Sequence, residues 1–253
     1  VCTQHMERIN EARVAVIGGV NMDIGGSPFA KLVMRDSNPG IITARPGGVG
    51  RNIAHDLRLL GVNVSLVTAV GGDVYGQGIL DSCRELGIDM SLARILPERR
   101  SSTYLYVTDE TGDMQIGIAD MEITECITPE YLASRMDEIN AFGAVVLDAN
   151  LSAESVEYAA RHCTAPIIAD PVSTAKAMRL VPVLDKLWAI KPNIYEAEKL
   201  TGEHDPEKAA AALLDKGVKR VFISLGEEGM LAAERGSTVH MPRELVTVVN
   251  TTG

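Results

Sequence analysis

Short apolar runs alternate with segments of helical periodicity along most of the chain. The run Val14–Val20 is apolar and uncharged, which is typical of a strand buried on both faces. Residues 52–60 then place Ile53 and Leu57 on one helical face and end before Gly61. The pattern therefore changes from strand to helix within the first quarter of the chain.

The same alternation recurs to the end of the sequence. Further strands are predicted at Val62–Val70, Ala144–Leu147, Pro166–Ala169, Leu187–Ile190 and Val218–Ser224. Helices are predicted after the capping residues Asp73, Thr128, Ser152 and Asp205, and over Ile194 to Leu200. Strands that alternate with helices predict one α/β domain over residues 1–253, with a mainly parallel sheet and helices on both faces.

Two stretches depart from this rhythm. Residues 25–45 contain glycine and proline turns and an alternating Ile42/Ala44 pair, and residues 101–119 form a hairpin pattern around Asp109–Gly112. Together they predict either a small second sheet that acts as a lid over a ligand or two ordinary surface hairpins.

Composition narrows the class of protein. Of 253 residues, 46% are apolar and 23% charged, so long disorder is excluded. The net charge of −10 and the 4% of aromatic residues disfavour nucleic acid as a partner. Four scattered cysteines form no zinc motif, and no segment is typical of a signal peptide or a membrane helix. We expect a cytoplasmic protein without membrane partners.

The familiar phosphate-binding loops are missing from the sequence. Gly71–Gly76 has the glycine spacing of a P-loop but is followed by Gln77-Gly78 instead of Lys-Ser/Thr, and no GxGxxG follows a strand. A nucleotide-dependent oxidoreductase is therefore disfavoured.

Polar and glycine-rich segments follow the predicted strands instead. Asn21-Met-Asp23 follows the first strand, where Asp23 either accepts sugar hydroxyls or closes a turn. Pro46-Gly-Gly-Val-Gly-Arg-Asn52 opens a helix, where the backbone of Gly47 and Gly48 either approaches a ligand or forms a tight turn with a cap.

Three later segments also lie just past strands. They are Lys191-Pro-Asn-Ile-Tyr-Glu196, Ser224-Leu-Gly226 and Asn250-Thr-Thr-Gly253. We expect all of these segments at one edge of the sheet.

In this order, the segments resemble the signatures of the PfkB, or ribokinase-like, family of carbohydrate and nucleoside kinases. The resemblance runs from Val14 to Gly253. Within the family, the subgroup of pseudouridine kinases is the most similar. The segments that carry this likeness are Asp36–Gly40, Pro46–Ala54, Gly71–Gly76, Ala119–Met121, Asp170–Ser173, Lys191–Asn193 and Asn250.

The resemblance implies a role for each segment. The family transfers the γ-phosphoryl group of ATP to a sugar or nucleoside hydroxyl, with Mg²⁺. The implied substrate contacts are Asn21, Asp23, Gly47, Gly48, Asn52 and Asn150, although Asp148 competes with Asn150 for its place. The implied nucleotide contacts are Asn193, Ser224, Gly226 and Thr252, and Glu196 would hold Mg²⁺ through water.

The sequence stops inside the second family signature. The resemblance implies Ala-Gly-Asp after Gly253, which would begin the anion hole, and the Asp three places beyond it would be the general base. The family often binds K⁺ near the position of Asn250. An amide there removes one negative charge, so we expect K⁺ activation to be weak or differently built.

The subgroup implies a specific substrate. We expect phosphorylation of the 5′-hydroxyl of pseudouridine, with Asn38 and Asp120 as candidates for contacts to the base, unless Asn38 only shapes its Asn-Pro turn. The alternatives are a related kinase of ribose, fructose or adenosine, and a non-catalytic nucleoside-binding regulator. Exposed strand edges in the lid suggest a homodimer.

Overall fold

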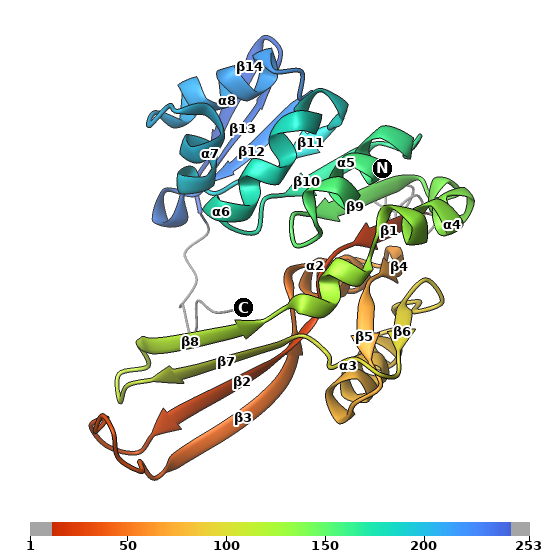
Figure 1. The fold of residues 1–253 in the computed structure, drawn as a ribbon. Coiled ribbons are helices and arrows are strands. Elements are labelled where there is room, and N and C mark those ends of the chain that lie inside the picture. The colour runs from red at the N-terminus through yellow and green to blue at the C-terminus, as the bar shows by residue number, and fades with distance from the viewer. Residues whose placement is uncertain (1–11, 244–253) are drawn as a thin grey trace.

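The computed structural model describes residues 12–243 and contains a large sheet with a smaller sheet projecting from it (Figure 1). The large sheet has the strand order β14-β13-β12-β11-β10-β9-β1-β4, in which neighbours from β12 to β4 are parallel. Its strands are β1 (Arg13–Ile17), β4 (Asn63–Val67), β9 (Ala144–Asp148), β10 (Ile167–Asp170), β11 (Ala189–Ile190), β12 (Arg220–Ser224), β13 (Met230–Glu234) and β14 (Ser237–Met241).

The helices begin where the sequence places capping residues. The side chains of Asp73, Thr128, Ser152 and Asp205 each accept a hydrogen bond from a backbone N–H in the first turn of the helix that follows. The helices are α2 (Val49–Leu59), α3 (Val74–Glu85), α4 (Pro129–Asn140), α5 (Ala153–His162), α6 (Thr174–Ala177), α7 (Ile194–Thr201) and α8 (Pro206–Asp215).

Helices cover both faces of the large sheet, as the alternation predicts. In β1, Val16 packs in one core cluster with residues of α2 and α3, while Ala15 and Ile17 pack in the other with residues of α4, α5, α7 and α8. Successive side chains of a strand point to opposite faces, so both faces of β1 are buried.

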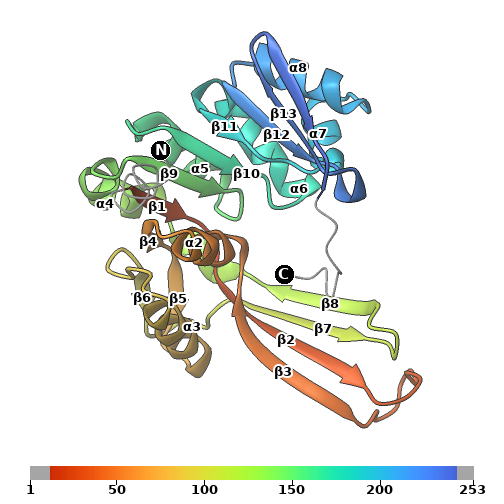
Figure 2. The same cartoon turned by 180° about the vertical axis from the view of Figure 1, so that it is seen from behind.

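The small sheet brings together the two segments that break the strand–helix rhythm. Its order is β3-β2-β7-β8, and it extends away from the large sheet in both views (Figures 1 and 2). Its strands are β2 (Asn21–Pro28), β3 (Gly40–Gly47), β7 (Thr103–Thr108) and β8 (Met114–Asp120). The hairpin predicted within residues 101–119 is confirmed.

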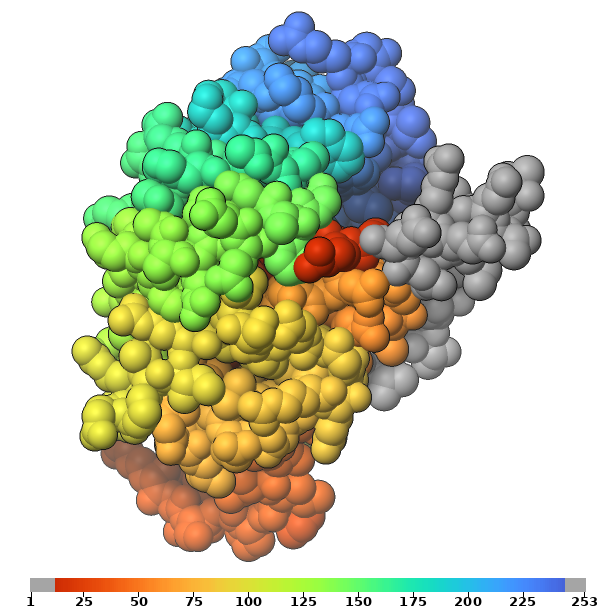
Figure 3. Space-filling view, turned by 90° about the vertical axis from the view of Figure 1, so that its right-hand side faces the viewer, coloured from red at the N-terminus to blue at the C-terminus, as the bar shows by residue number. Residues whose placement is uncertain are grey.

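From the side, the β2–β3 hairpin protrudes beneath the segment that contains α3 (Figure 3). A two-stranded parallel sheet, β5 (Ala69–Gly71) with β6 (Arg94–Leu96), lies in that segment. It interrupts the strand predicted at Val62–Val70, which divides into β4 and β5.

The antiparallel strands β13 and β14 are a second departure from the predicted pattern. They extend the sheet beyond β12, where the sequence indicated no further strand. None of the helices within residues 12–243 has the length and apolar character needed to cross a membrane.

Candidate functional site

The polar and glycine-rich segments gather at the carboxyl-end edge of the large sheet. Gly18 and Gly19 follow β1, Asp148 ends β9, Asp170 ends β10 and Ser224 ends β12. Because these strands are parallel neighbours, their ends meet at one edge, which is where open α/β sheets bind ligands.

Asp23 lies at the base of the small sheet rather than in a turn after β1. It is the third residue of β2 and pairs with Arg45 of β3 and Tyr104 of β7. The buried Asn21 donates from Nδ2 to Asp23 Oδ1 at 2.5 Å. Partial burial raises the pKa of Asp23, opposed by this hydrogen bond and by the charge of Arg51. The side-chain amide of Asn21 therefore fixes one oxygen of the Asp23 carboxylate.

Gly47 and Gly48 leave room that a side chain would fill. A methyl group at position 47 would lie 2.0 Å from Asp23 Oδ2. Gly48 has φ +98°, and a methyl group there would lie 2.7 Å from Gly19 O. Gly48 also caps α2, whose first turn carries the exposed Asn52. The structure thus brings the glycine turn to the Asp23 carboxylate.

Arg51, in the same glycine-rich segment, has a role that sequence reasoning missed. It is only 7% exposed and donates from its guanidinium to Ser82 Oγ at 2.7 Å. Its charge favours the ionised form of Asp23. The sequence shows an arginine next to Gly50, but it does not show that this arginine is buried or that its partner Ser82 lies on α3.

Two tyrosines share the face of the small sheet that carries Asp23. Tyr104 pairs with Asp23, and Tyr106 lies two residues further along β7, so all three side chains point to the same side. The rings are 5.9 Å apart, and each lies against a glycine of a neighbouring strand: Gly117 below Tyr104 and Gly25 below Tyr106. The alternating Tyr-Leu-Tyr of the hairpin could have indicated this aromatic surface.

Asp148 and Asn150, the two candidates for one substrate contact, are joined by a hydrogen bond. Asp148 is fully buried and accepts hydrogen bonds from Gly19 N at 2.9 Å and from Asn150 Nδ2 at 3.1 Å. Asn150 Oδ1 in turn accepts from Lys176 Nζ at 2.6 Å. Burial raises the pKa of Asp148 to about 6 although its partners all donate to it.

Asn193 and Glu196 form a reciprocal cap at the start of α7. Asn193 Oδ1 accepts from Glu196 N at 2.9 Å, and Glu196 Oε2 accepts from Asn193 N at 2.8 Å. Glu196 is 5% exposed, and burial raises its pKa, with the nearby Asp170 carboxylate adding to the effect. The Lys191 charge partly neutralises both carboxyl groups, and their two negative charges remain suited to a cation.

Ser224 lies beside this cap. A parallel bridge pairs it with Asn193, and its N–H donates to Pro192 O at 3.0 Å. Gly226 follows with φ +60° and open space around it. The structure therefore joins Asn193, Glu196, Ser224 and Gly226. Asn250, Thr252 and Gly253 lie outside the described residues.

The two candidates for base contacts are not brought to the side of Asp23. Asn38 lies in the loop beyond β2 and uses its amide there: Oδ1 accepts from Val33 N at 2.8 Å and Nδ2 donates to Val33 O and Asp36 O. Asn38 thus shapes its own turn.

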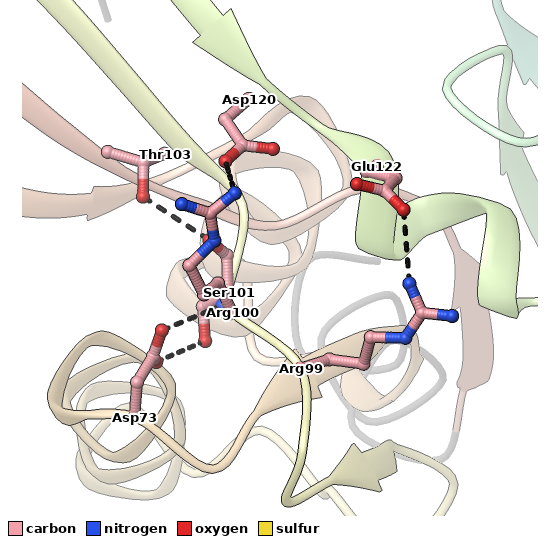
Figure 4. A network of polar contacts seen from close by, with 7 residues as sticks. All are labelled: Asp73, Arg99, Arg100, Ser101, Thr103, Asp120 and Glu122. Carbon is pink, nitrogen blue, oxygen red and sulfur yellow. Dashed lines mark hydrogen bonds and ion pairs between the residues drawn. The ribbon is translucent and has the colours of Figure 1, made fainter.

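Asp120 ends β8 on the face of the small sheet opposite to Asp23, because Ala119 is the residue that pairs with Tyr104. Its carboxylate lies 3.4 Å from an Arg100 guanidinium nitrogen, close to the pair formed by Arg99 and Glu122 at 3.0 Å (Figure 4). These four side chains line a hollow at the junction of the small sheet with the rest of the molecule.

Hydrogen bonds between Asp73 and Ser101 also stabilise this junction. Asp73 accepts from Ser101 N at 2.8 Å and from Ser101 Oγ at 2.6 Å, directly before β7 begins (Figure 4). These bonds lower the pKa of Asp73, although partial burial acts in the opposite direction. The glycine-rich segment that fails as a P-loop therefore serves to attach the small sheet.

Comparison with known proteins gives one family over nearly the whole chain. The family model described as "pfkB family carbohydrate kinase" matches residues 11–253. A pseudouridine kinase of Escherichia coli (strain K12) is 36% identical over 247 residues, which are 95% of this chain and 79% of that protein.

Solved structures show the same fold. A putative sugar kinase from Clostridium perfringens has a TM-score of 0.83 at 31% identity, covering 96% of this chain and 79% of that chain. A putative ribokinase II in complex with ATP and Mg²⁺ from E. coli has a TM-score of 0.82 at 20% identity, covering 96% and 82%. The latter likeness shows the fold alone.

Proposed function

Because this chain belongs to the pfkB family of carbohydrate kinases, we propose that it phosphorylates the 5′-hydroxyl of pseudouridine with ATP. Kinases of this family are phosphotransferases that act on hydroxyl groups and use ATP. The observation that carries the choice of a nucleoside is the placement of Asp23, which lies in the space left by Gly47 and pairs in register with Tyr104 of β7.

Asp23 supplies a charged acceptor for ribose hydroxyls. Hydrogen bonds to a charged partner contribute about 1.5–3 kcal/mol each when the groups are withdrawn from water. Asn21 fixes one carboxylate oxygen, so the other, Oδ2, faces the position of Gly47. With Gly48 and Asn52 at the start of α2, this arrangement can orient a ribose so that its 5′-hydroxyl faces the phosphoryl donor.

Tyr104 and Tyr106 supply a surface for the base. Stacking of a base on an aromatic side chain contributes about 1–3 kcal/mol. A free sugar such as ribose or fructose would leave this surface uncovered, which favours a nucleoside over those alternatives. Asn38 and Asp120 would reach a base only by exchanging the bonds they now make, so we assign the base contact first to Tyr104.

The nucleotide would lie against Asn193, Ser224 and Gly226, with Mg²⁺ near Glu196. The buried carboxyl group of Glu196 and the partly buried one of Asp170 fit a cation held mainly through water, since Mg²⁺ keeps several waters and uses few carboxylates. Bound Mg²⁺ would neutralise charge on the phosphates. We place the general base at the Asp that the family signature implies after Gly253. K⁺ dependence would involve the region of Asn250.

The small sheet would act as a lid that excludes water from the bound substrate. Its face opposite to Asp23 is apolar: it carries Ile42, which is 80% exposed, Ile118, which is 59% exposed, and also Leu105 and Ile116. Apolar patches of this kind are uncommon on isolated proteins. We propose that a second copy of the chain covers this face, forming a homodimer.

The test is a substrate panel with the full-length protein, Mg²⁺ and ATP. Release of ADP is followed with pseudouridine, uridine, adenosine, ribose and fructose. We expect the highest kcat/KM for pseudouridine, because a pseudouridine kinase is 36% identical to this chain over 95% of its length. A higher value for ribose or fructose would place the enzyme among sugar kinases. Nucleoside binding without turnover of any acceptor would favour a regulator.

A further inference from the structure

Lys176 has an unusual environment for a lysine. It lies in α6, just after β10, and its side chain is half-buried. Its ammonium donates to the neutral Asn150 Oδ1 at 2.6 Å, and within residues 12–243 it forms no ion pair with a carboxylate. Burial lowers the pKa of Lys176, the charge of Arg179 adds to this, and Asp148 opposes it. A positive charge is thus held with little neutralisation.

Lys176 lies between two groups of residues at the edge of the large sheet. Asp23 and the glycine turn lie near the end of β1, while Asn193 and Ser224 lie at β11 and β12. In the sheet, β9 and β10 stand between β1 and β11. Lys176 follows β10 and contacts Asn150, which follows β9. It therefore lies between the proposed nucleoside and nucleotide contacts.

Asn150 connects the lysine to the glycine turn. Asn150 contacts Gly19, where a methyl group would lie 2.9 Å from Asn150 Nδ2, and Gly19 O accepts a hydrogen bond from Gly50 N at 3.1 Å. Asp148 fixes the amide of Asn150 from the buried side. A continuous set of contacts thus runs from the start of α2 to the Lys176 ammonium.

Lys176 is not needed to hold the loop after β9. Arg179 already donates from its guanidinium to the backbone oxygens of Ala149 at 3.0 Å, Asn150 at 3.1 Å and Leu151 at 2.7 Å. If Lys176 only stabilised this loop, it would repeat what Arg179 already does, and the protein would have to hold a poorly neutralised positive charge to do so.

We propose that Lys176 contacts the phosphoryl group during its transfer, with Asn150 as a positioning residue. This inference rests on the kinase function proposed above. In the step, the bond between the γ-phosphorus and the β,γ-bridging oxygen breaks and a bond to the acceptor oxygen forms. The acceptor proton passes to the general base, and ADP leaves with the bridging oxygen. The ammonium stabilises negative charge on the phosphoryl oxygens.

The experiment compares Lys176→Met and Lys176→Arg with the wild-type full-length protein. Lys208→Met is the control, because Lys208 is an exposed lysine on α8. We expect Lys176→Met to lower kcat by roughly 10²–10³-fold, as for loss of one preorganised donor, with the nucleoside KM within about threefold of wild type. Lys176→Arg should recover part of kcat. A kcat within threefold of wild type for Lys176→Met would overturn the inference.

A second measurement does not depend on the acceptor. Calorimetric titration without nucleoside gives the ratio of the ADP and ATP dissociation constants, which reports contacts to the terminal phosphate. We expect Lys176→Met to reduce this ratio about tenfold and Lys208→Met to leave it unchanged. If no acceptor in the panel is phosphorylated, the proposed function fails, but this ratio still decides the role of Lys176. An unchanged ratio in Lys176→Met would contradict the contact.

Discussion

Asp23 and Gly47 share one small volume at the base of the small sheet, where any side chain at position 47 would meet the carboxylate. A methyl group on Gly47 would lie 2.0 Å from Asp23 Oδ2, far closer than two atoms can approach without bonding. The Asp23 carboxylate therefore explains why position 47 holds a glycine. The pair defines the place where we expect a ribose to bind.

Gly47→Ala should impair substrate binding more than folding. The new methyl group would displace the Asp23 carboxylate, which is the end of a side chain and can move. We expect the nucleoside KM to rise at least tenfold, with a small change in melting temperature. Gly26→Ala is a matched control, since a methyl group there would find its nearest neighbour at 3.9 Å. Equal effects of both substitutions on KM would contradict the role of Gly47.

Tyr104→Ala should weaken binding of nucleosides specifically. Loss of one stacking contact of about 1–3 kcal/mol corresponds to a rise in the dissociation constant of roughly 5–150-fold. Leu105→Ala is the control, because Leu105 is the next residue of β7 and points to the opposite face. Isothermal titration with pseudouridine measures both. If Leu105→Ala weakened binding as much as Tyr104→Ala did, the tyrosine face would not be the base site.

The fold was largely predictable because its signals are local. Apolar runs and the capping residues Asp73, Thr128, Ser152 and Asp205 locate most strands and helices within a few residues. The strand β14 was missed because it is exposed at every position and so has no buried face to give its sequence an alternating pattern. Thr68 divides the strand predicted at Val62–Val70, because the chain leaves the large sheet to pair with β6.

The position of a candidate residue in the fold was predictable where its own segment indicates a helix start, as at Gly47 and Glu196. It was not predictable where partners come from distant elements. The hydrogen-bonded set of Asp148, Asn150 and Lys176 connects β9 with α6, and nothing in the spacing of these residues indicates which of them would face a ligand. Asn38 differs from them, because every hydrogen bond of its side-chain amide is to a residue within five positions in the sequence.

The pKa of Asp148 predicts a pH dependence of stability. Its folded-state value of about 6 exceeds the ordinary value of 3.8, so the folded protein retains this proton in a range where the unfolded chain has lost it. This group's contribution to the free energy of unfolding therefore falls as pH rises from about 4 to 6, and is constant above that. Between pH 5 and 7, wild type should lose about 1 kcal/mol relative to Asp148→Asn.

Urea unfolding of both proteins across this range measures the difference, in which the other titrating carboxyl groups cancel. A difference that stays flat, or that favours wild type as pH rises, would show that Asp148 is not held with a raised pKa.

Ile42→Lys should disrupt the proposed dimer. Ile42 is 80% exposed on the apolar face, while its neighbour Ile41 is 56% exposed on the face of Asp23. Sedimentation analysis should find a dimer for wild type and for Ile41→Lys, and a monomer for Ile42→Lys, because a buried unpaired charge is costly. A wild-type monomer at micromolar concentration would rule out this interface.

The account depends most directly on Asp23 as the residue that holds the acceptor. The decisive measurement is kcat/KM for pseudouridine in full-length wild type and Asp23→Ala. Loss of a charged hydrogen bond and of the orientation it provides predicts a decrease of at least 10³-fold, with folding retained. A value for Asp23→Ala within a few-fold of wild type would contradict the assignment of Asp23 and the substrate site built around it.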